Sequence, residues 1–242
     1  AAHALIDYLN INHGFELEIK KNIKPGSGIG SSAACAVGAV YGINKLLGSP
    51  LKKEELLKFA MQGEFISSKT APADNVASAL FGGLILVNNQ EEYKVIKLPV
   101  PETLYAVVHH PLIEIKTSDA RVVLPKKVDL NTASNQLASM GGFVHSLHSA
   151  DFDLMRIILK DYLVEKYRSE YVPLFNEIKK TADSFNAICC SISGSGPSVF
   201  SLVDNYEEAK KIRSACDNLY IKNNIKFNSY ISRLNSDGVR IV

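Results

Sequence analysis

The stretch Pro25-Gly26-Ser27-Gly28-Ile29-Gly30-Ser31-Ser32-Ala33-Ala34 decides the fold that we predict for this chain. Before it, residues 15–20 alternate apolar and charged side chains, which predicts a half-buried strand. After it, apolar residues recur at helical spacing over residues 33–47, and Gly48 ends the pattern. The stretch is therefore predicted to be a strand-to-helix connection built from glycine and serine.

The composition of this connection suits an anion. Three glycines within five residues allow backbone angles that a Cβ atom would forbid, and they let a ligand approach the main-chain amides. The helix that follows begins with unpaired N–H groups and the positive end of its dipole, which favour phosphate. A tight turn without a ligand is the alternative. The stretch lacks the lysine of a P-loop, and its third glycine comes one position too early for a dinucleotide-binding fingerprint.

The full stretch resembles the P-x-x-x-G-[LI]-G-S-S-A-A signature of the GHMP small-molecule kinases. The resemblance implies an α+β fold of two domains. The first is a ribosomal-S5-like β-α domain, here without its N-terminal strands, and the second is a ferredoxin-like α+β domain. In that family the loop wraps the phosphates of ATP, which assigns residues 25–34 to the cofactor. Two prolines, Pro99 and Pro101, indicate a linker, so we expect domains at residues 1–100 and 101–242.

A magnesium site is the second expectation from the family. Glu64 lies at the predicted end of a helix, where a lone glutamate is usually solvated. In GHMP kinases, however, a glutamate at about this distance after the loop completes a Mg²⁺ site with the loop serine, here Ser32. Mg²⁺ takes oxygen ligands and few of them from protein, because phosphates and water supply the rest. The resemblance therefore assigns Ser32 and Glu64 to the metal.

The segment Ala73-Asp74-Asn75-Val76-Ala77, followed by Gly82-Gly83, resembles the H-A-D-N-V-A-P…G-G segment of the homoserine kinases, one branch of the family. Mevalonate-type members have a proposed aspartate base near the position of Asn75. An amide cannot take a proton at neutral pH, so the resemblance implies catalysis by positioning, with Asn75 orienting the acceptor hydroxyl. Asp74 either faces the substrate's ammonium group or caps its own helix. Pro72 stands where this branch usually has a histidine associated with the amino-acid site.

Two arginine segments complete the resemblance. Residues 117–125 match the T-x-x-A-R-x-x-L-P pattern of these kinases, and residues 165–168 match their E-x-x-R pattern. A single arginine is most often a surface charge. Together, Arg121 and Arg168 make chemical sense as a clamp, because each guanidinium group can bind a carboxylate through two parallel bonds. The resemblance assigns both arginines, with Thr117, to an amino-acid substrate, and it assigns Arg121 to catalysis as well.

A second glycine loop, Ser193-Gly194-Ser195-Gly196-Pro197, matches the G-[SA]-G-P-[ST] motif of the family. A bare turn between two strands is the alternative. The family role is to pack against the nucleotide loop, so Gly194 and Gly196 are expected to help shape the cofactor site.

Composition limits the partners. The formal charge of +2 and the absence of a basic run with interleaved aromatic residues argue against nucleic acid. No apolar stretch reaches membrane-spanning length. Four cysteines without paired spacing favour a reducing compartment, and we expect the cytoplasm. The chain starts inside an apparent helix without an initiator methionine, so we expect a preceding segment that carries the family's first motif.

The activity implied by the resemblance is transfer of the γ-phosphoryl group of ATP to the hydroxyl of L-homoserine. The product is O-phospho-L-homoserine, an intermediate of threonine biosynthesis, and family members commonly form homodimers. Two alternatives stay open. One is another GHMP kinase that acts on a mevalonate-type or sugar substrate, and the other is a GHMP-fold binding protein without catalytic activity.

Overall fold

The computed structural model describes residues 1–68, 73–88, 94–113, 115, 120 and 122–242. These residues form two compact units. The first unit comprises Ala1–Pro25, Gly30–Leu98 and Asn235–Val242, and the second comprises Gly26–Ile29 and Pro99–Leu234. Within the described part of the chain, no helix is both long enough and apolar enough to cross a membrane.

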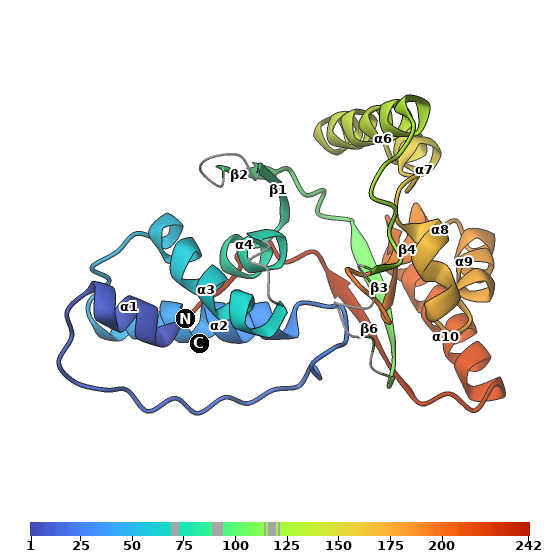
Figure 1. Cartoon of the computed structure of the whole chain (residues 1–242). Helices are drawn as coiled ribbons and strands as arrows, with labels where there is room; N and C mark the ends of the chain where they lie inside the picture. The colour runs from blue at the N-terminus through green and yellow to red at the C-terminus, as the bar shows by residue number, and fades with distance from the viewer. Residues whose placement is uncertain (69–72, 89–93, 114, 116–119, 121) are drawn as a thin grey trace. The chain divides into compact units, whose positions relative to one another are not determined.

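The first unit is mainly helical (Figure 1). Its elements are α1 (Ala2–Tyr8), α2 (Ser31–Leu46), η1 (Lys53–Leu56), α3 (Leu57–Ser68), α4 (Ala73–Phe81) and an antiparallel hairpin of β1 (Leu84–Asn88) and β2 (Lys94–Leu98). Helix α2 buries Val37, Val40 and Ile43, which recur every three residues and therefore share one face. The predicted helix after the glycine stretch is confirmed, since α2 ends at Leu46, two residues before Gly48.

The predicted strand over residues 15–20 is wrong for this structure. These residues have no regular secondary structure, and Leu17 and Ile19 are 42% and 57% exposed. Alternation supplies an apolar face, but a strand also needs a hydrogen-bonded neighbour. Among the described residues, the paired strands are those of the β1–β2 hairpin and of the sheet in the second unit, and none of them pairs with this segment.

The second unit is built on a four-stranded antiparallel sheet. In the order β4-β5-β3-β6, its strands are Cys189–Ile192, Val199–Val203, Tyr105–Pro111 and Phe227–Arg233. Numbered along the chain, this order is 2-3-1-4, with strands one and three in the centre, as in the ferredoxin-like fold. The predicted α+β architecture of this half is therefore confirmed.

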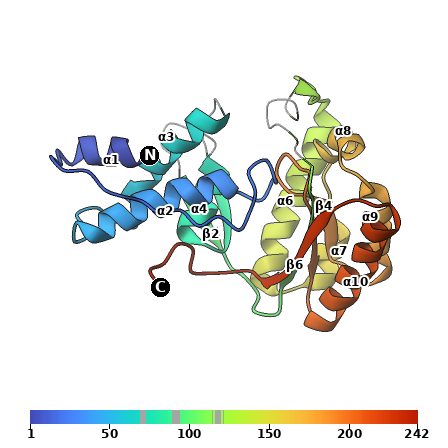
Figure 2. The same cartoon turned by 90° about the horizontal axis from the view of Figure 1, so that it is seen from below.

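Helices cover the sheet and extend beyond it (Figures 1 and 2). They are α6 (Leu130–Ser149), α7 (Phe152–Ile158), α8 (Glu165–Arg168), η2 (Ser169–Tyr171), α9 (Phe175–Ser184) and α10 (Tyr206–Lys222). Helices α9 and α10 pack together on the sheet, and their fully buried Ile178 and Ile212 join Val107 and Val199 of the strands in one core.

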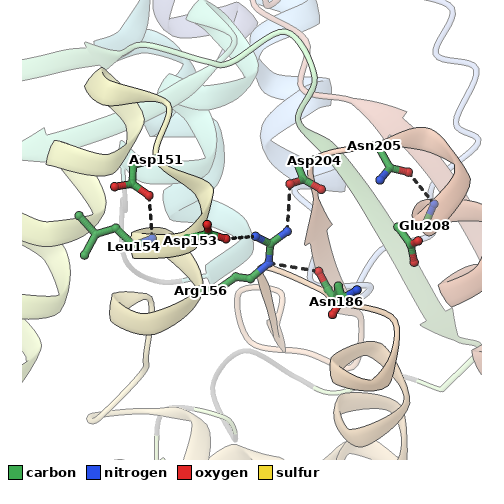
Figure 3. Close-up of polar contacts among 8 residues, drawn as sticks. All are labelled: Asp151, Asp153, Leu154, Arg156, Asn186, Asp204, Asn205 and Glu208. Atoms are coloured by element: carbon green, nitrogen blue, oxygen red, sulfur yellow. Dashed lines mark hydrogen bonds and ion pairs between the residues drawn. The ribbon is translucent and has the colours of Figure 1, made fainter.

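Arg156 fastens α7 to the rest of the second unit (Figure 3). Its guanidinium group donates to Asp153 Oδ1 and to Asp204 Oδ2, both at 2.9 Å, and to the main-chain oxygen of Asn186 at 3.4 Å. Asp151 caps α7 by accepting a bond from the amide of Leu154 at 2.9 Å. Asp204, the residue that follows β5, is thereby tied to α7.

The last eight residues belong to the first unit and fix the end of α4. The amide of Gly83 donates to the oxygen of Asn235 at 2.6 Å, and the amide of Val239 donates to the oxygen of Leu80 at 3.3 Å. The two main chains approach so closely that a Cβ atom on Gly238 would lie 2.4 Å from the oxygen of Leu80. Gly238 also has a positive φ of +67°. Only glycine fits this crossing without strain.

We therefore expect Gly238→Ala to destabilise the protein by about 1–3 kcal/mol, since the added methyl group meets main chain on the other side. The measurement is the free energy of unfolding in urea, followed by circular dichroism. Gly38→Ala is the matched control, because Gly38 lies within α2 with nothing within 4 Å of its Cβ position. That control should be neutral or stabilising by up to about 1 kcal/mol. Equal stability of the two variants would contradict the close approach of the main chains at Gly238 and Leu80.

Candidate functional site

The glycines of the 25–34 stretch adopt the conformations that only glycine takes easily. The φ angles of Gly26, Gly28 and Gly30 are +71°, +79° and +75°. Gly30 is the N-cap of α2, so it offers no side chain to the amides of the first turn, and that turn carries no acidic residue. The start of α2 is therefore suited to an anion that comes from outside the chain.

The part of the stretch in the second unit, Gly26–Ile29, is held by the second glycine loop. The hydroxyl of Ser198 donates to the oxygen of Ser27 at 2.6 Å, and the hydroxyl of Ser193 donates to the oxygen of Gly28 at 2.9 Å. Ser27 and Ser198 are 1% and 0% exposed. A Cβ atom on Gly28 would lie 2.5 Å from the oxygen of Ser193, so the two loops are in direct contact.

In the first unit, Ser32 and Glu64 lie together as the family resemblance implied. The hydroxyl of Ser32 donates to both carboxylate oxygens of Glu64, at 2.9 and 3.1 Å. The expectation that Glu64 ends its helix is wrong, because α3 continues to Ser68 and Glu64 is only 8% exposed. A buried carboxylate beside a hydroxyl is an all-oxygen donor set, which fits Mg²⁺.

Asn75 lies near the start of α2. A Cβ atom on Gly30 would lie 3.9 Å from Asn75 Oδ1. The main-chain amide of Asn75 donates to Asp74 Oδ1 at 2.7 Å, and both side chains are exposed. Asp74 sits in the first turn of α4, one residue inside the helix, so it is not the N-cap. Ser31 has a different task, since its hydroxyl donates to the oxygen of Ile23 at 2.7 Å.

Arg168 lies beside the second glycine loop in the second unit. Its Nη1 donates to the oxygen of Gly194 at 2.8 Å, and its Nε donates to the oxygen of Ala120 at 3.0 Å. Gly194 in turn contacts the first loop, because a Cβ atom there would lie 3.0 Å from the oxygen of Gly28. Within the second unit, Gly194 thus lies between the guanidinium group of Arg168 and Gly28. Thr117, Arg121 and Pro72 lie outside the described residues.

The buried thiols and His109 belong to the core of the second unit. Burial raises the pKa of the Cys190 and Cys216 thiols to about 12, which leaves them protonated at neutral pH. Burial also lowers the pKa of His109, although Asp217 Oδ1 lies 3.3 Å from its Nε2 and opposes that shift. Cys216 lies on α10, and Cys190 and His109 lie on strands of the sheet. All three are buried, so we assign them to structure.

Comparison with known families agrees with this arrangement. The model of the GHMP kinases N terminal domain matches residues 1–83, and that of the GHMP kinases C terminal domain matches residues 143–222. The chain belongs to the GHMP kinase family. Members of this family use ATP.

Three relatives of this GHMP kinase are named homoserine kinase. The chain is 35% identical to a homoserine kinase of Chlorobium phaeobacteroides over 245 aligned positions, covering 98% of this chain and 77% of the relative. It is 38% identical to a homoserine kinase of Chlorobaculum tepidum, covering 94% and 71%. The crystal structure of a homoserine kinase from Cytophaga hutchinsonii matches with a TM-score of 0.95 and 43% identity, covering 98% of this chain and 75% of that one.

Sequence reasoning missed the two serines that hold the glycine stretch. Ser193 and Ser198 flank the Gly-Ser-Gly-Pro core of the second loop, and their positions were the only available signal. Their hydroxyls bond to main-chain oxygens more than 160 residues away in sequence. A local motif cannot specify such a partner.

Proposed function

We propose that this GHMP kinase is a homoserine kinase, which transfers the γ-phosphoryl group of ATP to the hydroxyl of L-homoserine and releases ADP and O-phospho-L-homoserine. This step supplies threonine biosynthesis. The observation that carries the proposal is Arg168, half-buried and bonded to Gly194 beside the nucleotide loop. A guanidinium group in that place suits a substrate with a carboxylate, and the relatives named homoserine kinase cover nearly the whole chain.

The nucleotide is assigned to the 25–34 stretch. Main-chain amides of Gly28–Ser32 hold the phosphates, and the dipole of α2 supports the negative charge there. Ser32 and Glu64 hold Mg²⁺ through their oxygens, which lie within 3.1 Å of one another. When bound, the metal neutralises charge on the phosphates. The protein's own contribution is a loop whose conformation is fixed before ATP arrives.

Acceptor activation in this proposal needs no strong side-chain base. Asn75 cannot accept a proton at neutral pH, so its amide orients the substrate hydroxyl toward the phosphate. Phosphoryl transfer permits this, because the attacking oxygen forms little bond to phosphorus in a loose transition state. The amide at position 75 favours homoserine over mevalonate as the substrate, because mevalonate-type members have a proposed aspartate base near that position. A carboxylate alone does not distinguish the two substrates, since mevalonate also carries one. Arg168 and Arg121 bind the amino-acid carboxylate together with Thr117, and Asp74 is the candidate for its ammonium group.

Three further predictions concern the domain boundary, the oligomeric state and the location of the protein. We propose that the boundary between nucleotide and substrate domains lies at residue 100, where two prolines follow the β1–β2 hairpin. A homodimer and a cytoplasmic location stay predictions from the resemblance and from the cysteine pattern.

The direct test is ADP release by the full protein, measured with a coupled assay in ATP and Mg²⁺. L-homoserine should be turned over with a kcat/KM at least 100-fold above those for mevalonate and galactose. A faster reaction with either of those alcohols would replace the substrate assignment. Failure to bind ATP in the presence of Mg²⁺ would favour a non-catalytic binding protein.

The metal assignment predicts the outcome of Glu64→Gln. Replacing a carboxylate by an amide removes the charge that attracts Mg²⁺, so the Mg²⁺ concentration for half-maximal activity should rise about tenfold or more. The measurement is a Mg²⁺ titration at saturating ATP and homoserine. Glu54→Gln is the control, because Glu54 is exposed in the same unit. An unchanged Mg²⁺ requirement in Glu64→Gln would remove Glu64 from the metal site.

A further inference from the structure

Helix α8, which carries Arg168, is too short to be stable by itself. It spans only Glu165–Arg168, and an isolated single turn does not repay the cost of helix nucleation. Its start is fixed by Asp161. The Oδ1 atom of Asp161 accepts bonds from the amides of Leu163 and Val164, both at 2.8 Å, and Oδ2 accepts from the amide of Glu165 at 3.1 Å. The position of α8 therefore depends on contacts made by side chains.

The Glu165 side chain makes the second set of contacts. Its Oε1 atom forms an ion pair with Lys179 Nζ of α9, and its Oε2 atom accepts a bond from the Ser191 hydroxyl of β4 at 2.9 Å. The side chain is only 16% exposed. Taking a carboxylate out of water is costly unless both oxygens are bonded, and here both are. Neither the nucleotide nor the metal assignment above uses this group.

The geometry connects Glu165 to Arg168. The two residues are three positions apart, so they share a face of α8. Glu165 bonds to Ser191, which lies three residues before Gly194, and Arg168 bonds to Gly194 itself. The start and the end of α8 are thus attached to the same strand and the loop that follows it.

We propose that Glu165 is a positioning residue for Arg168, through which it sets the affinity for the amino-acid substrate. The carboxylate holds α8 against β4 and α9, so that the guanidinium group keeps one orientation beside Gly194. A group held in place binds a carboxylate without first losing conformational freedom. This inference rests on the proposed function, because it assumes that Arg168 binds the homoserine carboxylate.

Glu165→Gln tests the inference through the separate KM values. Glutamine keeps the shape and an acceptor for Ser191, but it loses the charge opposite Lys179. The KM for homoserine should rise about tenfold or more, whereas the KM for ATP should change less than twofold. The control is Glu207→Gln, which removes an exposed ion pair with Lys210 on α10 and should leave both constants unchanged. Equal increases in the two KM values of Glu165→Gln would overturn the proposal.

A double-mutant cycle asks whether Glu165 acts through Arg168. In an Arg168→Met background, Glu165→Gln should raise the KM for homoserine no further, because the group that it positions is gone. If the two increases multiply, Glu165 acts independently of Arg168 and the inference is wrong. Should Glu165→Gln fail to fold, Ser191→Ala serves instead, since it removes one bond to Glu165 and leaves the Lys179 pair.

Amide hydrogen exchange separates this inference from the proposed function. Exchange of the amides of 165–168 should become faster in Glu165→Gln and should stay unchanged in Glu207→Gln. This measurement needs no substrate. If wild-type protein does not phosphorylate homoserine, the proposed function fails while the exchange result still decides whether Glu165 holds α8. Unchanged exchange in Glu165→Gln would overturn the positioning role whatever the substrate is.

Discussion

The bonds from two serine hydroxyls to the main-chain oxygens of Ser27 and Gly28 are the constraint on which the conformation of Gly26–Ile29 depends. A glycine-rich segment is flexible when nothing holds it, and amides that must be ordered during binding bind weakly. Ser198 and Ser193 remove that freedom in advance. Gly28 is required at the contact because any Cβ atom would collide with the oxygens of Ser193 and Gly196. In the proposed function, this prior order prepares the main-chain amides to bind phosphate.

Those features of the site that are local in sequence could be predicted. The period of apolar residues predicted α2, and the glycines at its start have the positive φ angles that justify their presence. Ser32 and Glu64, assigned by resemblance, do lie within hydrogen-bonding distance. The extent of α3 was predicted wrongly, because Gly63 resembles a helix end, whereas the helix continues to Ser68. Burial of Glu64 could not be read from its own neighbours.

The features that could not be predicted depend on partners distant in the chain. Residues 15–20 have the alternation of a strand, but alternation does not supply the neighbouring strand that a sheet requires. The bond between Ser198 and Ser27 joins residues 171 positions apart. The E-x-x-R segment was recognised for its arginine, whereas the contacts of Glu165 with Lys179 and Ser191 give its glutamate a role as well.

Substrate selection in the proposed function comes from the guanidinium groups of Arg168 and Arg121, which bind the carboxylate of the amino acid. The measurement that tests it most directly is the ratio of kcat/KM values for L-homoserine and for 3-aminopropan-1-ol, the same alcohol without its carboxylate. A site built to bind a carboxylate rejects the analogue that lacks it, so the ratio should be about 10⁴. A ratio within about tenfold of unity would show that Arg168 does not bind the substrate, and it would contradict the account.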